Sequence, residues 1–236
     1  MGLAPLWQAT RSILNQAPIA MPVLPFSSDA DVVHFAKAFL DNHIERFKKD
    51  IAICLTPKKV NSAKSHAYFP ALITCIAFAD LLSGLNAGKL DGHGLRELKD
   101  YITKFMNNTD YTSDRIDVLY ECFRHKVAHL AQPYVVFDTN SSKRQTFKGQ
   151  RRRLMAWTVR ASGPRPPIII VPVNSRQQIK NAVTPWSVYY DHRVIVSVRG
   201  LASDIVHSIP RYLRHLKTDN SARTRFKDCM QSYFPR

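Results

Sequence analysis

Cysteine and glycine are both scarce in this chain. Its 236 residues include four Cys and eight Gly, and no two cysteines form a Cys-x-x-Cys pair. This spacing argues against zinc clusters and thioredoxin-like motifs. The few glycines, with 14 Pro, also exclude collagen-like and low-complexity repeats. Because Cys54, Cys75 and Cys122 lie among apolar residues, we expect them to be reduced core residues of a cytoplasmic protein.

The sequence also lacks a hydrophobic run long enough to cross a bilayer. The longest apolar run, Ala71 to Leu85, has 15 residues and is interrupted by Asp80, so it fits a buried helix better. Residues 1–27 contain one Arg and four Pro, without the basic-then-apolar order of a secretory signal. We therefore expect residues 1–27 to form an extended arm, and we expect no association with membranes.

Acidic residues are scarce in the second part of the chain. Residues 1–135 contain 15 Lys/Arg and 13 Asp/Glu, whereas residues 136–236 contain 19 and 5. The net charge of +16 therefore lies almost entirely after residue 135, which favours a polyanionic partner such as nucleic acid. A solvated surface that keeps the protein soluble is the alternative. The densest cluster, where we expect nucleic-acid-binding residues, consists of Lys143, Arg144, Lys148, Arg151, Arg152 and Arg153.

Helical periodicity dominates the first part of the chain. Apolar residues recur every three or four positions from Val32 to Phe47, after a capping sequence at residues 27–29. A second expected helix is apolar nearly all round, which is typical of the centre of a bundle. Four helices with connections of several residues predict an antiparallel bundle over residues 28–135. We expect these helices over residues 29–54, 70–87, 95–105 and 113 to before Pro133.

The hydrophobic period changes after residue 133. Short alternating segments predict strands, and a helix over residues 200–217 follows, which Pro210 is expected to kink or split. We therefore predict a mainly α (α+β) fold. Its bundle is followed over residues 136–236 by a basic extension with a small β-hairpin or sheet and a C-terminal helix. The expected strands cover residues 135–137, 154–159, 168–173 and 192–198.

The fourth expected helix carries a concentration of polar residues. One interpretation is a metal site, because Glu121, His125 and His129 are spaced by four residues and share one helix face. Lys126 weakens this interpretation, since it stands where a zinc protease has its general base and its charge repels a cation. A second interpretation is the solvent-facing side of an ordinary helix.

A third interpretation is a metal-independent phosphodiester site. Arg124 and His129 are five residues apart, which on an α-helix corresponds to a rise of about 7.5 Å and a turn of about 140°. The two side chains can therefore flank a groove or meet across a pair of helices. A guanidinium binds phosphate oxygens in a bidentate manner and stabilises transition-state charge. A histidine near neutrality takes up or returns a proton.

The segment Arg124–His129 resembles the Arg-x(4–6)-His motif of HEPN domains. The similarity includes Leu119–Phe123 before the motif and the apolar helix that contains Asp80, and it covers roughly residues 28–135. The strands and final helix resemble a decoration found on some members. Residue 131 is Ala, so the variant with Tyr two residues after the histidine is not matched. The resemblance implies an endoribonuclease that needs no metal or cofactor.

The resemblance also implies roles for individual residues. In this family the 2′-hydroxyl of RNA attacks the neighbouring phosphate at a composite site formed by two protomers. Arg124 would stabilise the phosphate, and His129 would act as acid or base. His125 and Lys126 occupy variable positions of the motif, and we take them, with Glu121, as supporting candidates. We expect Asp80 either to approach Arg124 or His129 as an orienting group or to pair elsewhere.

The expected partners follow from the same resemblance. They are RNA, a second copy of the chain, and an antitoxin or other regulatory protein, because many members are toxins or defence effectors. Other members have lost catalysis and only bind. A non-catalytic nucleic-acid or nucleotide-binding protein and a dimerising interaction module are therefore the alternative functions.

Overall fold

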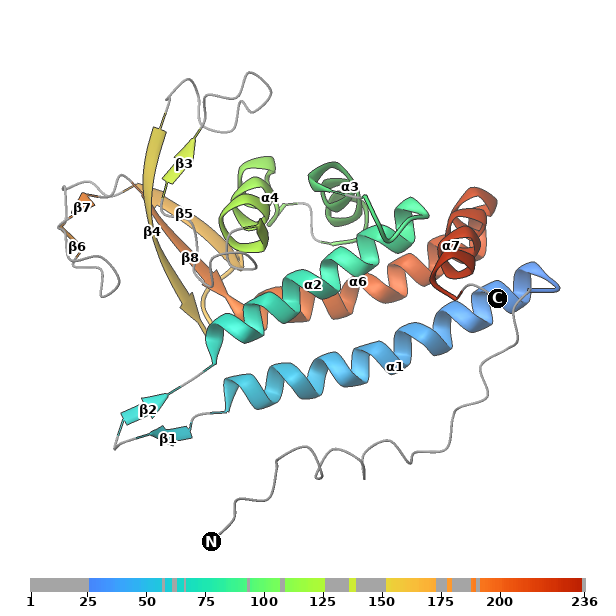
Figure 1. The fold of residues 1–236 in the computed structure, drawn as a ribbon, viewed down its shortest axis with the longest axis horizontal. Coiled ribbons are helices and arrows are strands. Elements are labelled where there is room, and N and C mark those ends of the chain that lie inside the picture. Colours follow the sequence, from blue (N-terminus) through green and yellow to red (C-terminus); the bar gives the residue numbers. More distant parts are fainter. Residues whose placement is uncertain are drawn as a thin grey trace, which may run out of the picture.

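The structure, a computed structural model, combines a group of helices with a small sheet at one end (Figure 1). Its described part contains six helices, one of which continues into a π-helical segment, and a four-stranded mixed sheet. The prediction of a mainly α fold with a small β part is confirmed. The structure describes residues 26–56, 58–60, 63–65, 67–92, 94–106, 109–125, 136–138, 152–172, 178–179, 188–189 and 192–234.

The first helix, α1, spans Asp29–Leu55, close to the expected range. It begins at Ser28, whose Oγ accepts a hydrogen bond from the backbone N–H of Asp31 at 3.2 Å. This bond satisfies one of the free amides of the first turn. The short strands β1 (Lys58–Val60) and β2 (Ala63–Ser65) then pair antiparallel.

The second helix, α2, spans Tyr68–Ala87 and runs antiparallel to α1 (Figure 1). It is long and apolar enough to cross a membrane by length and composition alone, and 56% of its most apolar stretch is buried inside the protein. Gly88 ends it in the left-handed region, with φ 81°. A Cβ on Gly88 would lie 3.1 Å from Cβ of Arg225, so both conformation and space favour glycine there.

The next helices cross α2 steeply, since Figure 1 shows them almost end-on while α2 lies in the plane of the view. α3 spans Leu95–Phe105, as predicted. α4 (Ser113–Val118) continues as the π-helical segment η2 (Leu119–His125). The expected continuation of this helix towards Pro133 lies outside the described residues.

The sheet has the strand order β3-β4-β8-β5. Its strands are β3 (Val136–Asp138), β4 (Arg152–Arg160), β5 (Ile168–Pro172) and β8 (His192–Ser197). β4 and β8 are parallel, whereas β3–β4 and β5–β8 are antiparallel. The sequence predicted a hairpin or a sheet, and the structure has a sheet. Strands β4 and β5 do not pair with each other as a hairpin, because β8 lies between them. A separate antiparallel pair consists of β6 (Gln178–Ile179) and β7 (Val188–Tyr189).

Two helices follow the sheet. α6 spans Val198–Thr218 and starts at Ser197, whose Oγ accepts from the N–H of Gly200 at 3.3 Å. It continues as one helix through Pro210, so of the predicted kink or split the split does not occur. The sequence patterns did not indicate α7 (Asn220–Tyr233), which begins immediately after α6.

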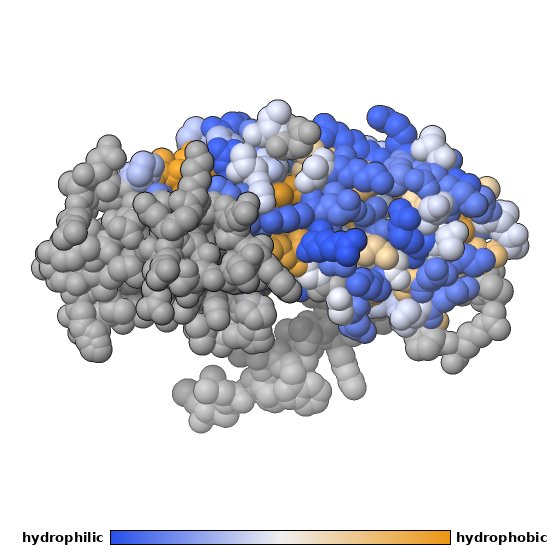
Figure 2. Space-filling view, turned by 90° about the horizontal axis from the view of Figure 1, so that it is seen from above, coloured by the Kyte–Doolittle hydropathy of each residue, from blue (hydrophilic) through white to orange (hydrophobic). Residues whose placement is uncertain are grey.

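The buried side chains form one core that joins both parts of the sequence. Phe35 of α1 meets Phe226 of α7 with ring centroids 6.4 Å apart, and Tyr101 of α3 is hydrogen-bonded to Ser208 of α6 at 2.8 Å. Thus α6 and α7 pack with α1, α2 and α3, and an antiparallel four-helix bundle restricted to residues 28–135 is not confirmed. Seen from above, hydrophilic side chains cover most of the described surface (Figure 2).

The cysteines lie inside this core without disulfides. Cys75 and Cys122 are buried and Cys54 is half-buried, and all four cysteines of the chain are free. Burial raises the pKa of Cys122 to about 12 and that of Cys229 to about 11, so these thiols are neutral near pH 7. The predicted core position is confirmed for Cys75 and Cys122, and Cys54 packs against the core.

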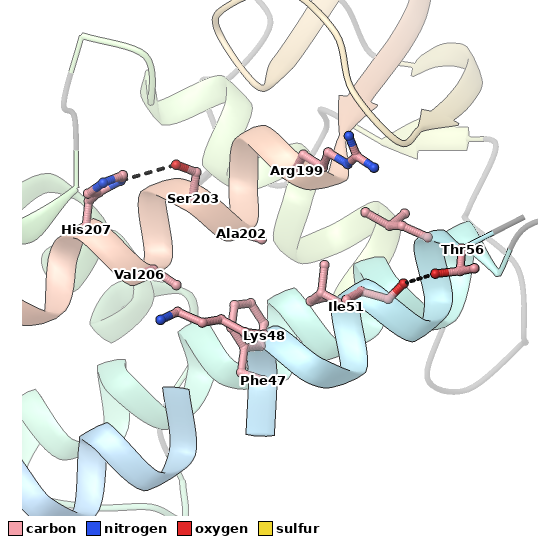
Figure 3. Close-up of a pocket in the computed structure, with 11 residues that line it drawn as sticks. Phe47, Lys48, Ile51, Thr56, Arg199, Ala202, Ser203, Val206 and His207 are labelled. Carbon is pink, nitrogen blue, oxygen red and sulfur yellow. Dashed lines mark hydrogen bonds between the residues drawn. The ribbon is translucent and has the colours of Figure 1, made fainter. Parts of the chain in front are cut away.

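Helices α1 and α6 enclose a groove between them (Figure 3). Apolar side chains form most of its floor, and cationic side chains stand along its edges. The groove lies between the C-terminal half of α1 and the N-terminal half of α6. Its lining residues lie between Phe47 and Thr56 at the end of α1, and between Arg199 and His207 on α6.

Candidate functional site

The structure brings together two candidate site residues from helices that are distant in sequence. Arg124 lies on η2 and Asp80 on α2. Nε of Arg124 donates a hydrogen bond to Oδ2 of Asp80 at 2.8 Å, and Nη2 lies 2.6 Å from the same oxygen. Of the arrangements expected for Asp80, the approach to Arg124 is the one observed.

An aromatic ring completes the surroundings of the guanidinium. Cζ of Arg124 lies 4.7 Å from the ring centroid of Tyr120, one turn earlier on η2, which is a cation–π contact. The side chains of Arg124 and Asp80 are 24% and 18% exposed. The guanidinium is therefore held between a carboxylate and a ring while still accessible to solvent.

The backbone at this site is π-helical rather than α-helical. Leu119–His125 is wound with i→i+5 hydrogen bonds, a rare conformation that occurs frequently at functional sites. The expected geometry of Arg124 and His129 assumed α-helical winding throughout. Since Arg124 and His125 belong to the π-helical segment, that assumption is wrong for the start of the motif.

The inner side of η2 anchors it in the core. Cys122 and Phe123 are buried, at 3% and 1% exposure. Glu121 is half-buried, and its charge adds to burial in raising the pKa of the neighbouring Cys122 thiol. Arg124 thus follows directly after two core residues, which fixes where its side chain leaves the helix.

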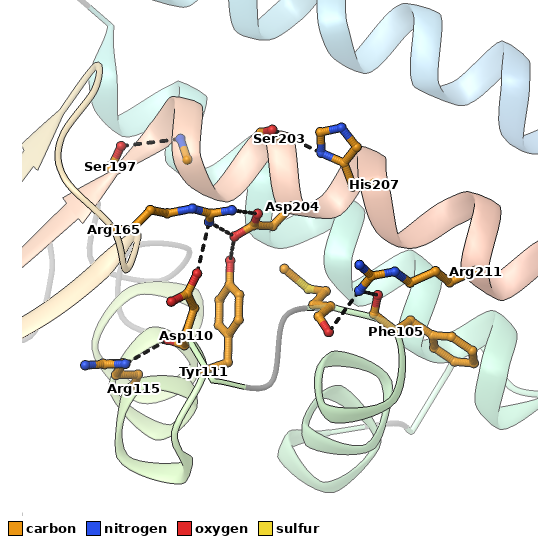
Figure 4. A network of polar contacts seen from close by, with 12 residues as sticks. Phe105, Asp110, Tyr111, Arg115, Arg165, Ser197, Ser203, Asp204, His207 and Arg211 are labelled. Atoms are coloured by element: carbon orange, nitrogen blue, oxygen red, sulfur yellow. Dashed lines mark hydrogen bonds and ion pairs between the residues drawn. The ribbon is translucent and has the colours of Figure 1, made fainter.

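A polar network holds the start of α4 in place (Figure 4). Arg165, before β5, donates to both oxygens of Asp204 on α6 at 2.5 and 2.7 Å, and the Tyr111 hydroxyl donates to Asp204 Oδ2 at 2.8 Å. Arg165 also lies 3.3 Å from Asp110. Because Asp204 is only 5% exposed, this paired charge ties sheet, α6 and α4 together and so positions the segment that carries Arg124.

An exposed apolar stripe on α2 leads to the Arg124–Asp80 pair. Pro70, Ile73 and Ala77 are all exposed, Ile73 at 40%, and they precede Asp80 at helical spacing along one face. The sequence did not reveal this stripe, because α2 is apolar on all sides and no periodic contrast marks the exposed face. The stripe is an exposed apolar surface beside the candidate site.

Several predicted site residues fall outside the part of the chain that the structure describes. Lys126, His129, Lys143, Arg144, Lys148 and Arg151 lie outside the described residues, as do the side chains of His125, Arg152 and Arg153. The backbones of Arg152 and Arg153 begin strand β4, where they pair with β3.

The metal-site interpretation depends partly on the same undescribed region. In the described part of the chain, no three His, Cys, Asp or Glu side chains are grouped to hold a metal ion. The arrangement of Glu121, His125 and His129 includes His129, so it stays a prediction.

Comparison of the chain with protein-family models, curated proteins and solved structures finds no match. A functional inference therefore depends on the residues and contacts described above. Within the part of the chain that the structure describes, Arg124 and Asp80 are two predicted site residues in direct contact.

Proposed function

We propose that the protein is a metal-independent endoribonuclease of HEPN type, acting in the cytoplasm as a toxin or defence effector. The observation that carries this proposal is the pairing of Arg124 with Asp80 across η2 and α2. A carboxylate that fixes an exposed guanidinium orients a phosphate-binding group in advance, which is how electrostatic catalysis avoids reorganisation during the reaction.

Arg124 keeps binding capacity in this arrangement. Asp80 engages Nε and Nη2, and among the described residues Nη1 has no acceptor. A guanidinium offers five N–H donors in a planar fork, so Nη1 and the outer edge can donate hydrogen bonds to a phosphate oxygen. In the proposed site Arg124 therefore neutralises charge on the scissile phosphate.

The proposed reaction is an internal transesterification. The ribose 2′-oxygen forms a bond to the adjacent phosphorus, and the bond from phosphorus to the 5′-oxygen of the next nucleotide breaks. The proton of the 2′-hydroxyl passes to a general base, and the departing 5′-oxygen receives a proton from a general acid. His129 is proposed for one of these two proton transfers, as the acid or as the base, and at a composite site the His129 of a second protomer is available for the other. The products are a 2′,3′-cyclic phosphate and a 5′-hydroxyl, without oxidant, metal or cofactor.

A homodimer with a composite site is part of the proposal. The exposed stripe Pro70, Ile73 and Ala77 supports it, because a second copy seated on this stripe would also cover the edge of the Arg124–Asp80 pair. An antitoxin or regulatory protein that masks the same stripe would block the assembly. The cluster between Lys143 and Arg153 is proposed to attract RNA through its charge.

The test is cleavage of RNA by the purified protein in EDTA. We expect cleavage to persist, and Arg124→Ala and His129→Ala to reduce the rate by about 10²–10³-fold. Arg124→Lys retains the charge but not the planar fork, so it should also be impaired. Arg46→Ala is the matched control, since Arg46 is exposed on α1 and its loss changes the net charge equally.

Two results contradict the proposal. Loss of cleavage on adding EDTA alone would favour the metal site instead. RNA binding that weakens steeply with salt, without any cleavage, would identify a non-catalytic binding protein.

A further inference from the structure

The groove between α1 and α6 has the dimensions and lining of a small-molecule site (Figure 3). Its volume is about 550 Å³, within the range of roughly 300–1,000 Å³ that is usual for ligand pockets. Apolar residues from both helices provide most of its surface: Phe47, Ile51, Ala52, Leu55, Ala202 and Val206.

The floor favours an aliphatic ligand over a nucleic-acid base. Bases bind proteins by stacking on exposed aromatic faces. The one aromatic residue among the lining residues, Phe47, is 3% exposed and stacks on Phe78, with ring centroids 4.7 Å apart and planes 12° from parallel. The other apolar side chains of the groove are aliphatic: Ala52 is exposed, Val206 is half-buried and Ile51 is 7% exposed, and such side chains suit a hydrocarbon chain.

The rim of the groove is cationic. Lys48 of α1 and His207 of α6 line the same end of the groove, and Arg199 stands at the other end (Figure 3). None of the described residues that line the groove is acidic. The contact of Lys48 with Glu45, 3.0 Å long, joins two exposed side chains, so it competes only weakly with an anionic ligand.

Hydrogen bonding arranges the imidazole at this rim. Nδ1 of His207 shares a hydrogen bond with Oγ of Ser203, one turn earlier on α6, at 3.2 Å. This bond leaves the other ring nitrogen as the group that can meet a ligand. Lys48 lines the same end of the groove, so this end offers Nζ of Lys48 and, when it carries the proton, the other nitrogen of His207 as donors to an anionic group.

We propose that the α1–α6 groove binds an amphiphile with one anionic head, a carboxylate or a phosphate, on an aliphatic chain. The head lies between Lys48 and His207, and the chain lies over Ile51, Leu55 and Ala202. This site is separate from the Arg124–Asp80 pair and does not depend on the nucleolytic proposal. It gives the protein a second ligand, from the class of fatty acids and single-chain lipid phosphates.

Calorimetric titration of the full chain with decanoate and with decyl phosphate, each below its micelle-forming concentration, tests this proposal. We expect saturable binding of one molecule per chain, with the neutral decanol about tenfold weaker. Stronger binding of decanoate identifies a fatty-acid-type head, and stronger binding of decyl phosphate a lipid-phosphate-type head. Lys48→Gln should weaken binding about fivefold, whereas Lys49→Gln, its exposed neighbour outside the groove, should not.

A blocking variant makes the test independent of charge. Ala52 is exposed in the groove wall, so Ala52→Trp fills the groove without entering the core and should abolish binding. Ile53→Trp is the matched control, because Ile53 is 63% exposed and does not line the groove. Arg124→Ala should bind decanoate like the parent protein, which separates this proposal from the nucleolytic one.

Three outcomes overturn the proposal. They are the absence of binding below the micelle concentration, equal affinity for decanol and decanoate, and binding that survives Ala52→Trp. Displacement of decanoate by a short RNA would also overturn it, since the groove would then belong to the nucleic-acid surface.

Discussion

A single aspartate in an otherwise apolar helix marks the candidate site at the scale of residues. An ionised carboxylate is expensive to bury without a partner, and Arg124 supplies that partner to Asp80. The sequence already indicated both residues, Asp80 by its isolation in an apolar run and Arg124 by its motif. The contact of Tyr120 with Arg124 was not predictable, because nothing in the spacing distinguishes a ring that packs in the core from one that covers a guanidinium.

Asp80→Asn tests how far this contact orients Arg124. The amide keeps the shape of the carboxylate but not its charge, so the guanidinium loses its anchor. If the nucleolytic proposal is correct, we expect RNA cleavage to fall about tenfold, with less change in substrate affinity. Asp41→Asn, which breaks an exposed ion pair with Lys37, is the control. Unchanged cleavage by Asp80→Asn would remove Asp80 from the site.

His215 predicts a pH dependence of stability. Burial, and then the charge of Lys104, lower its pKa below the ordinary value, although Asp219 opposes them. Nζ of Lys104 lies 2.9 Å from Nε2, which suits a neutral ring. Below the ordinary histidine pKa of about 6.5, the unfolded chain therefore takes up the proton more readily than the folded one. The contribution to stability is complete above that pH and is lost as the pH falls towards the lowered value.

The measurement is the urea midpoint at pH 7.5 and at pH 5.5. We expect His215→Gln to show a smaller loss of stability between these pH values than the parent protein. His34→Gln, which removes an exposed histidine on α1, should retain the parental loss. Equal losses in the parent protein and His215→Gln would refute the prediction.

At the scale of elements, local chemistry explains which boundaries were predictable. Ser28 starts α1 by a side-chain cap, and Gly88 ends α2 because it adopts a left-handed φ. Both boundaries depend on the chemistry of the residue itself. The π-helical winding of Leu119–His125 was not predictable, because it follows from packing rather than from spacing. The helix Asn220–Tyr233 was also missed, since many polar residues separate its buried members Ala222, Phe226, Cys229 and Met230.

Gly88 provides a test of the α2 boundary. An alanine there must adopt a positive φ and also place its Cβ 3.1 Å from Cβ of Arg225. We expect Gly88→Ala to destabilise the protein by about 1–3 kcal/mol in urea unfolding. Gly92→Ala is the matched control, because Gly92 has φ 67° but a Cβ there would have nothing within 4 Å. Its loss of stability should therefore come only from the strained φ. Equal losses for the two variants would show that the contact with Arg225 has no effect.

At the scale of the whole molecule, charge and packing divide the chain differently. The net charge changes sharply at residue 135, and the sequence suggested a bundle followed by a separate extension. Yet α6, which carries Arg199, Arg214 and Lys217, packs beside α1 and α2 in the common core. Contacts between residues a hundred or more positions apart are not visible as periodicity, so this joint packing could not be predicted from the sequence.

Phe226 tests whether both parts of the chain share one core. It is fully buried in α7 and meets Phe35 of α1 across nearly the whole length of the chain. We expect Phe226→Ala to lower the free energy of unfolding by about 3–5 kcal/mol while the protein still unfolds in a single transition. Tyr233→Ala, at a residue that is 53% exposed on the same helix, should change stability by about 0.5 kcal/mol or less. Two separate unfolding transitions would instead indicate independent parts.

The late position of α6 and α7 also affects how the chain matures during synthesis. The ribosome adds about 5–20 residues per second, so it needs roughly 5–20 s to advance from the end of η2 to the end of α7. Throughout that interval, α6 and α7 have not yet been made and cannot cover the apolar faces of α1 and α2. The nascent chain thus carries Arg124 and Asp80 without their packed scaffold. If the protein cuts RNA, it acquires that ability only after these helices have been made and have packed.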